Sequence, residues 1–268
     1  MQPAPVGPLP AELARYLATA WLGRRVYFFP ETDSTNDVAQ ELARGGEPEG
    51  TIVVADHQRH GRGRRGHTWS SPPGRDVLCS MILRPEGDAR GALPVTLAIA
   101  TAISVALSKF LDVDFLVKWP NDVVSAQGKI AGILAESAGT GGRVDHVVVG
   151  MGINVNSTAG DWPAELRPAA VSCRSLTGSP WDRALILADV LGTIEAYYDR
   201  FRREGFGPLA SAYEARLWQM GRPVAFEWSG ARASGVVTGV ARDGALRVAL
   251  DADGAVVELY SEMVEVIG

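Results

Sequence analysis

The chain has 268 residues, of which 46% are hydrophobic and 21% are charged, a composition typical of a soluble globular protein that buries a core. Its 26 basic and 31 acidic residues give a net charge of −5, which argues against a surface that coats nucleic acid, so any anion site must be local. The start of the chain lacks a secretory signal, and residues 93–111 carry too many polar groups for a membrane span of roughly 20 residues, so we expect a cytoplasmic protein with no membrane partner.

Helices and strands alternate up to residue 218. The first half predicts an amphipathic helix over 10–22, a strand over 25–29, a helix from Asp33 or Ser34 to Arg44, strands over 51–55 and 77–84, and a buried helix over 94–111. The second half predicts strands over 115–119, 129–137 and 144–155, and helices over 180–203, capped by Ser179, and over 208–218. We therefore expect an α+β domain over 1–219, in which a mixed, mainly antiparallel sheet packs with helices.

The pattern changes after Gly221. Short alternating strands follow at close spacing, over 224–228, 231–240, 245–250, 255–260 and 263–267. This spacing is typical of a small β-barrel. We therefore place a domain boundary near Met220 and expect a second domain over 220–268.

No spacing of residues predicts a metal site. Three histidines lie in the segment 57–67, but arginines crowd them and Asp56 is the one carboxylate nearby, so a cation would be poorly held there. Cys79 and Cys173 lie far apart and fit no ligand spacing. We expect two reduced cysteines and no bound metal, and the chain also lacks the G-x-x-x-x-G-K-[ST] pattern of a P-loop.

Residues 61–66 read GRGRRG and set three arginines among three glycines. The glycines let backbone N–H groups approach an anion, while Arg62, Arg64 and Arg65 offer forked donors for phosphate oxygens. Together with Arg59 these side chains repel one another within a Debye length of roughly 8 to 10 Å. We therefore expect a loose segment that orders as a lid over a phosphorylated intermediate. A solvated basic loop is the alternative.

A second group of polar residues lies in KWPNDVV, 118–124, and GKIAGILAES, 128–137. Lys129 can place its ammonium on a phosphate or on a developing carboxylate charge, and Asp122 can orient or deprotonate an incoming amine. Asn154 ends a strand in the glycine-rich bend GMGINVN. The alternatives are a surface charge for Lys129, a turn-forming acid for Asp122 and a plain turn amide for Asn154.

Five motifs, taken together and in this order, resemble those of the biotin protein ligases. They are S-T-N at 34–36, H-Q-x-x-G-R-G-R-R-G-x-x-W-x-S-P-x-G at 57–74, K-W-P-N-D at 118–122, G-K-x-A-G-I-L-x-E at 128–136 and G-x-G-I-N-V at 150–155. The resemblance implies the fold of that family, which is like that of class II synthetases, with a catalytic domain followed by a small SH3-like β-barrel.

The same resemblance implies a ligase that works in two steps. Biotin and ATP, the latter with Mg²⁺, give biotinyl-5′-adenylate, and a lysine in the biotin carboxyl carrier domain of a carboxylase then takes the biotinyl group. By position, the family's biotin contacts match Ser34, Thr35, Asn36, Gln58, Arg62, Gly63, Arg64 and Lys129. Its positions near the nucleotide match Arg64, Arg65, Trp69, Asn121 and Asn154. Its catalytic positions match Lys129, Arg64 and Asp122.

The sequence departs from the family pattern at two positions. His67 stands where another arginine is common, and His57 stands where some members have an aromatic residue, so neither is assigned to the site. Some members carry an N-terminal DNA-binding domain, which the roughly 30 residues before the first motif cannot hold, so we expect the monofunctional type with no DNA partner. The resemblance leaves open which carboxylase is the acceptor and whether the chain forms a homodimer.

Two rival functions stay open. A lipoate ligase or an octanoyl transferase of related fold also produces acyl-lysine, although the transferases rely on a cysteine nucleophile and Cys79 lies in an apolar strand that disfavours its thiolate. A phosphate-binding or RNA-binding module without enzymatic activity is the other rival. It would need a more basic surface and aromatic side chains for stacking.

Overall fold

The computed structural model describes residues 9–85, 92–140, 143–228 and 231–260. Its centre is a seven-stranded sheet with the strand order β1-β2-β3-β7-β6-β5-β4. The strands are β1 (Arg25–Phe29), β2 (Thr51–Ala55), β3 (Val77–Leu83), β4 (Leu116–Lys118), β5 (Asp122–Ser125), β6 (Gly128–Thr140) and β7 (Arg143–Ile153). β1 and β2 run parallel and the other neighbours run antiparallel, which confirms a mixed, mainly antiparallel sheet.

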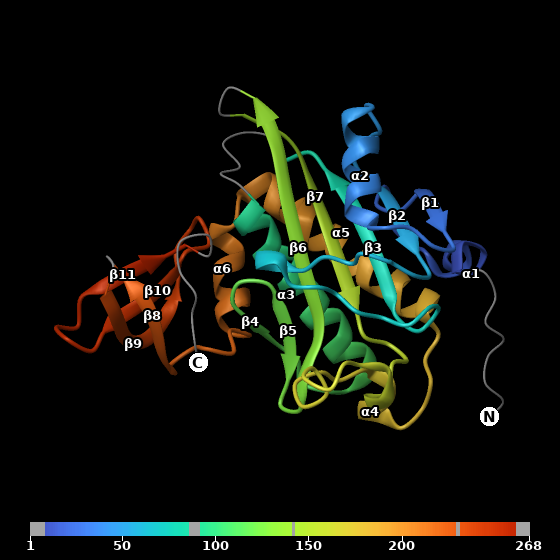
Figure 1. Ribbon diagram of the computed structural model, residues 1–268. Coiled ribbons are helices and arrows are strands. Elements are labelled where there is room, and N and C mark those ends of the chain that lie inside the picture. Colours follow the sequence, from blue (N-terminus) through green and yellow to red (C-terminus); the bar gives the residue numbers. More distant parts are fainter. Residues whose placement is uncertain (1–8, 86–91, 141–142, 229–230, 261–268) are drawn as a thin grey trace.

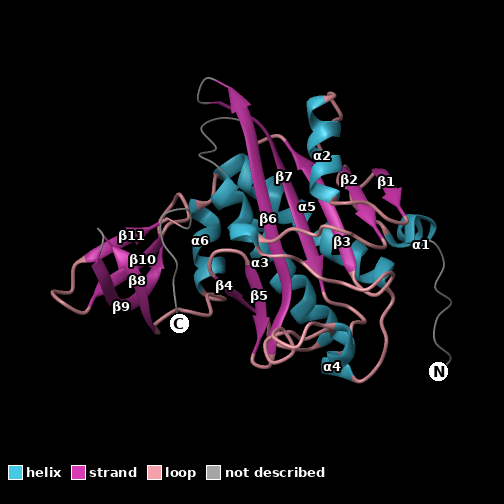
Figure 2. Cartoon of the chain, viewed as in Figure 1, coloured by secondary structure: helices cyan, strands magenta, loops and turns pink. Residues whose placement is uncertain are grey.

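Helices cover both faces of this sheet (Figure 1). They are α1 (Leu9–Tyr16), α2 (Thr35–Arg44), α3 (Ala92–Leu111), α4 (Cys173–Thr177), α5 (Arg183–Glu204) and α6 (Gly207–Glu214). α2 lies on one face, and α3 and α5 lie on the other. Loops that join the strands also cross the α2 face (Figure 2).

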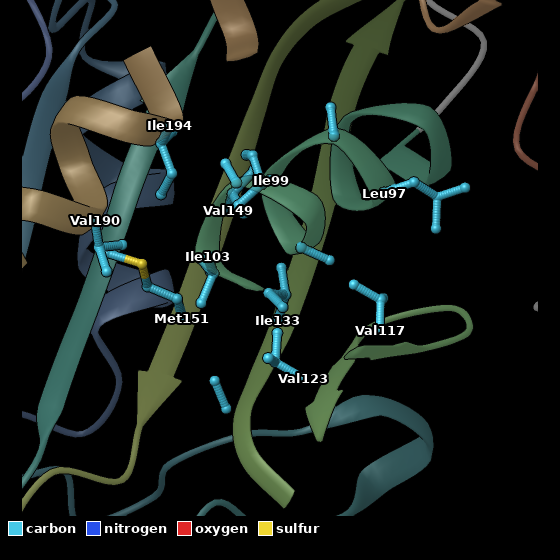
Figure 3. Close-up of a cluster of buried hydrophobic side chains, with 14 of the residues drawn as sticks. Leu97, Ile99, Ile103, Val117, Val123, Ile133, Val149, Met151, Val190 and Ile194 are labelled. Atoms are coloured by element: carbon cyan, nitrogen blue, oxygen red, sulfur yellow. The ribbon is translucent and has the colours of Figure 1, made fainter. Parts of the chain in front are cut away.

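The main hydrophobic core lies between the sheet and the pair α3 and α5. Ile99 and Ile103 of α3 meet Val149 and Met151 of β7, with Ile133 of β6 beside them (Figure 3). α3 is long and apolar enough to cross a membrane by composition, but most of it is buried in this core, as in the central helix of a soluble protein. Because apolar side chains surround this helix, its burial rather than amphipathicity explains its composition.

The second face of the sheet packs against α2 in a smaller cluster. Val53, Ile82 and Val148 point to this side, and Ala39 and Ala43 of α2 cover them. Their chain neighbours Val54, Met81 and Val149 belong to the main core. Successive residues of a strand point to opposite faces, so strands buried on both faces read as continuous apolar runs.

Three predicted helix boundaries are wrong, for local reasons. α1 ends at Tyr16 rather than residue 22, because Ala20, Trp21 and Leu22 donate their backbone N–H groups to Glu195 instead of continuing the helix. α5 begins after Asp182, whose carboxylate accepts from the first N–H groups of the helix, so Ser179 is not the cap.

α6 ends at Glu214, and the residues after it pair with β4 instead of extending the helix. Two elements are absent from the prediction, the four-residue strand β5 and the five-residue helix α4. Both are too short to show a period in the sequence.

A second sheet follows with the order β11-β10-β9-β8, in which all neighbours are antiparallel. Its strands are β8 (Pro223–Trp228), β9 (Ala231–Val240), β10 (Leu246–Leu250) and β11 (Val256–Leu259). The fifth predicted strand, over 263–267, lies outside the described residues. The turn between β9 and β10 packs against α3, where Gly244, at φ +88°, lies against Leu93 and Leu97.

Glu195 gives a test of how the N-terminal turn is held. Burial alone would raise the pKa of its carboxyl, but the three N–H donors of residues 20–22 outweigh it and hold the pKa below the ordinary value of 4.5. The charged carboxylate therefore stabilises the fold above that value, and this contribution is lost as the pH falls through the lowered pKa.

We expect Glu195→Gln to lower the free energy of unfolding by roughly 1 to 3 kcal/mol at neutral pH, and to differ less from the wild type at acidic pH. Urea unfolding across a pH series measures this. Glu204→Gln, which removes an exposed ion pair with Arg200 within one helix, should cost about 0.5 kcal/mol or less. A deficit of Glu195→Gln that grows in acid would contradict the assignment.

Candidate functional site

A pocket of about 430 Å³ lies on the α2 face of the large sheet. Its size suits a small organic ligand. Every residue that the sequence proposes for the site lines this pocket: Ser34, Thr35, Asn36, Gln58, Arg62, Gly63, Arg64, Arg65, Trp69, Asn121, Asp122, Lys129 and Asn154. Five motifs that are separate in the sequence therefore meet in one place.

Part of the floor of the pocket is sheet backbone at glycines, which have no side chain of their own to cover it. Gly132 of β6 pairs with Gly152 of β7, and the indole of Trp69 lies over both. A Cβ added to Gly152 would come within 2.3 Å of Cε2 of Trp69, and one added to Gly132 within 2.9 Å of its Cζ3. Two glycines at paired positions are thus what lets a tryptophan lie on this sheet.

Gly150 has a similar reason one step along β7. A Cβ there would lie 2.1 Å from Oδ1 of Asn36. Val148, Gly150 and Gly152 follow one another on the same face of β7, so the strand passes from contact with α2 to contact with Asn36 and then with Trp69. The glycines of the G-x-G-I-N-V motif therefore make room for side chains of the site.

One end of the pocket is a network of neutral polar side chains, most of them buried. Gln58 Oε1 accepts from the backbone N–H of Thr35 at 2.7 Å and from its hydroxyl at 2.9 Å. Ser80 of β3 contacts Thr35 Oγ1 at 2.7 Å and Asn36 Oδ1 at 2.6 Å. Ser34 occupies the N-cap position of α2 without a side-chain capping hydrogen bond, and it lines the pocket.

The other end of the pocket carries charge. Lys129 Nζ lies 2.7 Å from Asp122 Oδ1 and 5.6 Å from the centre of the Trp69 ring. Asp122 pairs with Gly132, which pairs in turn with Gly152, so this carboxylate begins the row of residues that runs beneath Trp69. The arrangement fixes an ammonium beside an aromatic ring in a half-buried site, where a cation attracts an anionic ligand more strongly than in water.

The GRGRRG segment forms the wall above this floor. Gly63 N donates to His67 O at 2.7 Å and Trp69 N donates to Gly61 O at 2.9 Å, and a short 3₁₀ turn, Arg64–Gly66, lies between these bonds. Arg65 takes a left-handed conformation at φ 53°. The segment is thus folded back on itself by its own backbone.

The sequence predicts that the four arginines in and beside this segment repel one another, but Arg59 and Arg62 are each paired with carboxylates. Arg62 binds both oxygens of Glu136, at 3.0 and 2.9 Å, and Asp37 at 2.7 Å. Arg59 contacts Asp33 at 2.8 Å and Glu31 at 3.3 Å. The guanidinium of Arg62 is therefore paired with carboxylates, although it is partly exposed, and it is not free to bind phosphate.

The neck of this segment is also fixed. Gly74 N donates to the carbonyl of Asp56 at 2.9 Å, so the two ends of residues 56–74 meet. The carboxylate of Asp56 pairs with the buried Arg183 at 2.8 Å. Beside them Asp76, fully buried, accepts from the backbone N–H of Val155 at 2.8 Å and from the hydroxyls of Ser157 and Ser71 at 2.5 and 2.7 Å.

Two predicted nucleotide contacts are held by backbone groups. Asn154 Nδ2 donates to the carbonyl of Val171 at 3.0 Å, and Asn121 Nδ2 donates to that of Ile133 at 3.0 Å. Both side chains line the pocket, but these bonds also make them anchors of the chain around it. Their first effect is thus to fix the shape of the pocket.

Two histidines of this segment lie beside carboxylates, and both cysteines are buried. His57 lies 3.0 Å from Glu31, and His60 lies 3.0 Å from Asp33, while His67 lines the pocket. In the described parts of the chain no three His, Cys, Asp or Glu side chains gather as metal ligands would. Burial raises the pKa of Cys79 far above its ordinary value and that of Cys173 to about 12.

Sequence reasoning missed several residues that shape the pocket. Ser80 and Asp76 act through partners distant in the sequence and carry no motif. Glu136 is the last residue of the G-K-x-A-G-I-L-x-E motif and pairs with Arg62. A charged residue that ends an apolar motif is a sequence signal for such a partner. Gln219 contacts the backbone of Trp119 from beyond α6, and no local pattern points to it.

The sequence and the structure both have known relatives. A model of the biotin/lipoate A/B protein ligase family matches residues 28–154. The chain is 32% identical over 255 residues to the bifunctional ligase/repressor BirA of Bacillus subtilis, covering 95% of this chain and 78% of that protein. It is 35% identical over 223 residues to the biotin--[acetyl-CoA-carboxylase] ligase of Paracoccus denitrificans, covering 80% and 90%.

Among solved structures, the biotin protein ligase from Aquifex aeolicus in complex with biotin and ATP resembles the chain with a TM-score of 0.78. It is 28% identical, and the match covers 91% of this chain and 99% of that one.

Gly152→Ala tests the bare floor. The added methyl would overlap the Trp69 ring, so we expect the indole to move and stability to fall by roughly 1 to 3 kcal/mol. A crystal structure and urea unfolding measure the two effects. In the control, Gly192→Ala, the glycine lies within α5 with no atom near its added Cβ, and stability should rise by up to about 1 kcal/mol. An unmoved indole in Gly152→Ala would contradict the packing described here.

Proposed function

Because this chain belongs to the biotin/lipoate A/B protein ligase family, we propose that it activates biotin with ATP and transfers the biotinyl group to a lysine of a biotin carboxyl carrier domain. The observation that carries the proposal is the pocket itself. It joins a neutral hydrogen-bonding end to a charged end beside a tryptophan. Such a pocket suits a ligand with a neutral polar head and a carboxylate tail that must meet a nucleotide.

The neutral end suits the ureido ring of biotin. That ring has two N–H donors and one carbonyl acceptor, and hydroxyl and amide groups can meet both kinds. Ser34, Thr35, Asn36 and Gln58 provide such groups. The network through Ser80 holds two of these side chains before the ligand arrives, so little ordering cost falls on binding.

The charged end suits the first chemical step. The carboxylate of biotin attacks the α-phosphorus of ATP, the bond to the β-phosphate breaks, and pyrophosphate leaves. Both reactants are anions, so a fixed cation between them lowers the barrier. We propose Lys129 for this task because it lines the charged end of the pocket, and its contact with Asp122 supports a role for that carboxylate in orienting the ammonium.

In the second step the lysine amine of the acceptor attacks the acyl carbon. The acyl–phosphate bond breaks, AMP leaves, and the amine loses a proton. Asp122 is the carboxylate that we propose to assist the amine, because it lies at the charged end of the pocket. Exclusion of water matters here, since an acyl adenylate hydrolyses readily, and the wall formed by Arg64 and Arg65 serves that purpose.

The nucleotide would occupy the side of the pocket near Trp69, with Asn121 and Asn154 beside it. We propose that the indole packs against adenine and that Arg64 and Arg65 face the phosphates. Arg62 contributes its backbone and the adjacent Gly63 to the biotin site, since Glu136 and Asp37 hold its guanidinium. Mg²⁺ enters as part of the ATP substrate, held by phosphate oxygens rather than by a protein site.

The net charge of −5 supports a protein acceptor rather than DNA, and the carboxyl carrier domain of a cytoplasmic carboxylase fits the reaction. We propose that the C-terminal unit over 220–268 closes as an SH3-like barrel beside the catalytic domain over 1–219. A transferase that uses a cysteine nucleophile is disfavoured, because Cys79 is fully buried in the core and its pKa is raised.

The substrate is tested by incubating the protein with labelled biotin or labelled lipoate, ATP with Mg²⁺, and a carrier domain for each. We expect transfer of biotin and, at equal concentrations, at least about a hundredfold less transfer of lipoate, because lipoate has no ureido group for the neutral end. Transfer of lipoate in preference to biotin would overturn the proposal.

Lys129→Ala tests the first step. We expect formation of the adenylate to slow by about 10²-fold or more, because a cation facing the reacting anions is lost. The rate is measured by the release of pyrophosphate. Lys109→Ala is the matched control, since Lys109 is exposed in the last turn of α3. Equal rates in the two variants would remove Lys129 from the mechanism.

A further inference from the structure

The segment that joins the two sheets lies along the free edge of β4. Val117 N donates to Arg216 O at 2.8 Å, and Trp218 N donates to Val117 O at 2.9 Å. Leu217 and Val117 thus form a parallel bridge. The junction between α6 and β8 is therefore joined to β4 by a one-residue bridge next to the K-W-P-N-D motif.

Gln219 continues this pairing with its side chain. Its Oε1 accepts from the backbone N–H of Trp119 at 2.8 Å, and its Nε2 donates to the carbonyl of Trp119 at 3.3 Å. The side chain of Gln219 is fully buried. One amide thus satisfies both backbone polar groups of a buried residue, where water cannot replace it.

Two further contacts hold the same motif from the C-terminal side. The indole N–H of Trp119 donates to the carbonyl of Gly244 at 3.0 Å, in the turn between β9 and β10. Lys118 Nζ lies 5.2 Å from the centre of the Trp218 ring, and Arg222 lies 4.2 Å from it. The motif, which lines the pocket, is thus also attached to the junction and to the second sheet.

We propose that Gln219 is a positioning residue for the charged end of the pocket. By fixing the backbone of Trp119 it sets where Asp122 begins β5, and Asp122 in turn holds the ammonium of Lys129. Gln219 is not itself part of the pocket lining, but its side chain hydrogen-bonds to Trp119, which is. The inference rests on the proposed function, because the step that it affects is formation of the adenylate.

The neutral end of the pocket should not depend on Gln219. Thr35 and Gln58 are held by each other and by Ser80 of β3, on the opposite side of β6 and β7 from β4 in the strand order. Loss of Gln219 should therefore slow the reaction of biotin with ATP much more than it weakens the binding of biotin. A general loss of folding would instead affect both.

The test compares Gln219→Met with the wild type. Methionine has a similar length but cannot satisfy the N–H and C=O of Trp119, so the motif must shift to find other partners. We expect the single-turnover rate of pyrophosphate release, at saturating biotin and ATP, to fall about tenfold or more. The Kd of biotin should stay within about twofold of the wild type. Gln127→Met, at an exposed glutamine in the turn before β6, is the matched control and should change neither value.

Gln219→Glu provides a second measurement. A protonated carboxyl can accept from Trp119 N–H and donate to its carbonyl as the amide does, whereas a carboxylate cannot donate. Burial favours the protonated form, so the rate relative to the wild type should rise as the pH is lowered. The folded fraction, followed by circular dichroism, is measured in parallel.

An unchanged rate in folded Gln219→Met would overturn the positioning role, as would a parallel loss of biotin affinity and rate. A ratio of Gln219→Glu to wild type that does not vary with pH would also count against it. A wild-type protein that makes no adenylate from biotin overturns the proposed function itself, so the two failures are distinct.

Discussion

The pocket depends on two paired glycines of neighbouring strands, where the sheet carries no side chain of its own. Gly132 and Gly152 pair across β6 and β7, and the indole of Trp69 occupies the space that two Cβ atoms would fill. Several other parts of the site lie around that ring. Lys129 lies beside it, the GRGRRG segment precedes it in the chain, and the polar cluster around Asn36 lies over Gly150. Glycine in the interior of a strand normally lowers its stability. Here the glycines are what allow the flat aromatic ring to lie on the sheet.

The charges around the pocket are largely compensated within the protein. Arg62 lies between Asp37 and Glu136, Arg59 between Asp33 and Glu31, and Lys129 against Asp122. An acidic chain can thus carry a locally basic segment without strong self-repulsion. The partners also orient the cations, and an oriented cation needs little reorganisation when a negative charge develops nearby.

Much of the fold could be predicted from local sequence. β1 and β2 have the predicted bounds, because β-branched and aromatic residues stand between clear turn residues. The pocket residues could be proposed because the motifs carry unusual combinations such as GRGRRG and KWPND. Gln219 and Ser80 could not, since each acts on a residue more than 40 positions away. The sequence does not reveal the pairing of Arg62 either, because its acidic partners lie 25 and 74 positions away, on α2 and β6.

The closed neck of residues 56–74 has a consequence for access to the pocket. The carbonyl of Asp56 and the N–H of Gly74 join the two ends, while Arg183 and Asp76 fasten the same place to the interior. The loop is thus compact, with its two ends held together and its base fixed to the large sheet. A displacement of the tip that admits a ligand would therefore leave the register of β2 and β3 unchanged.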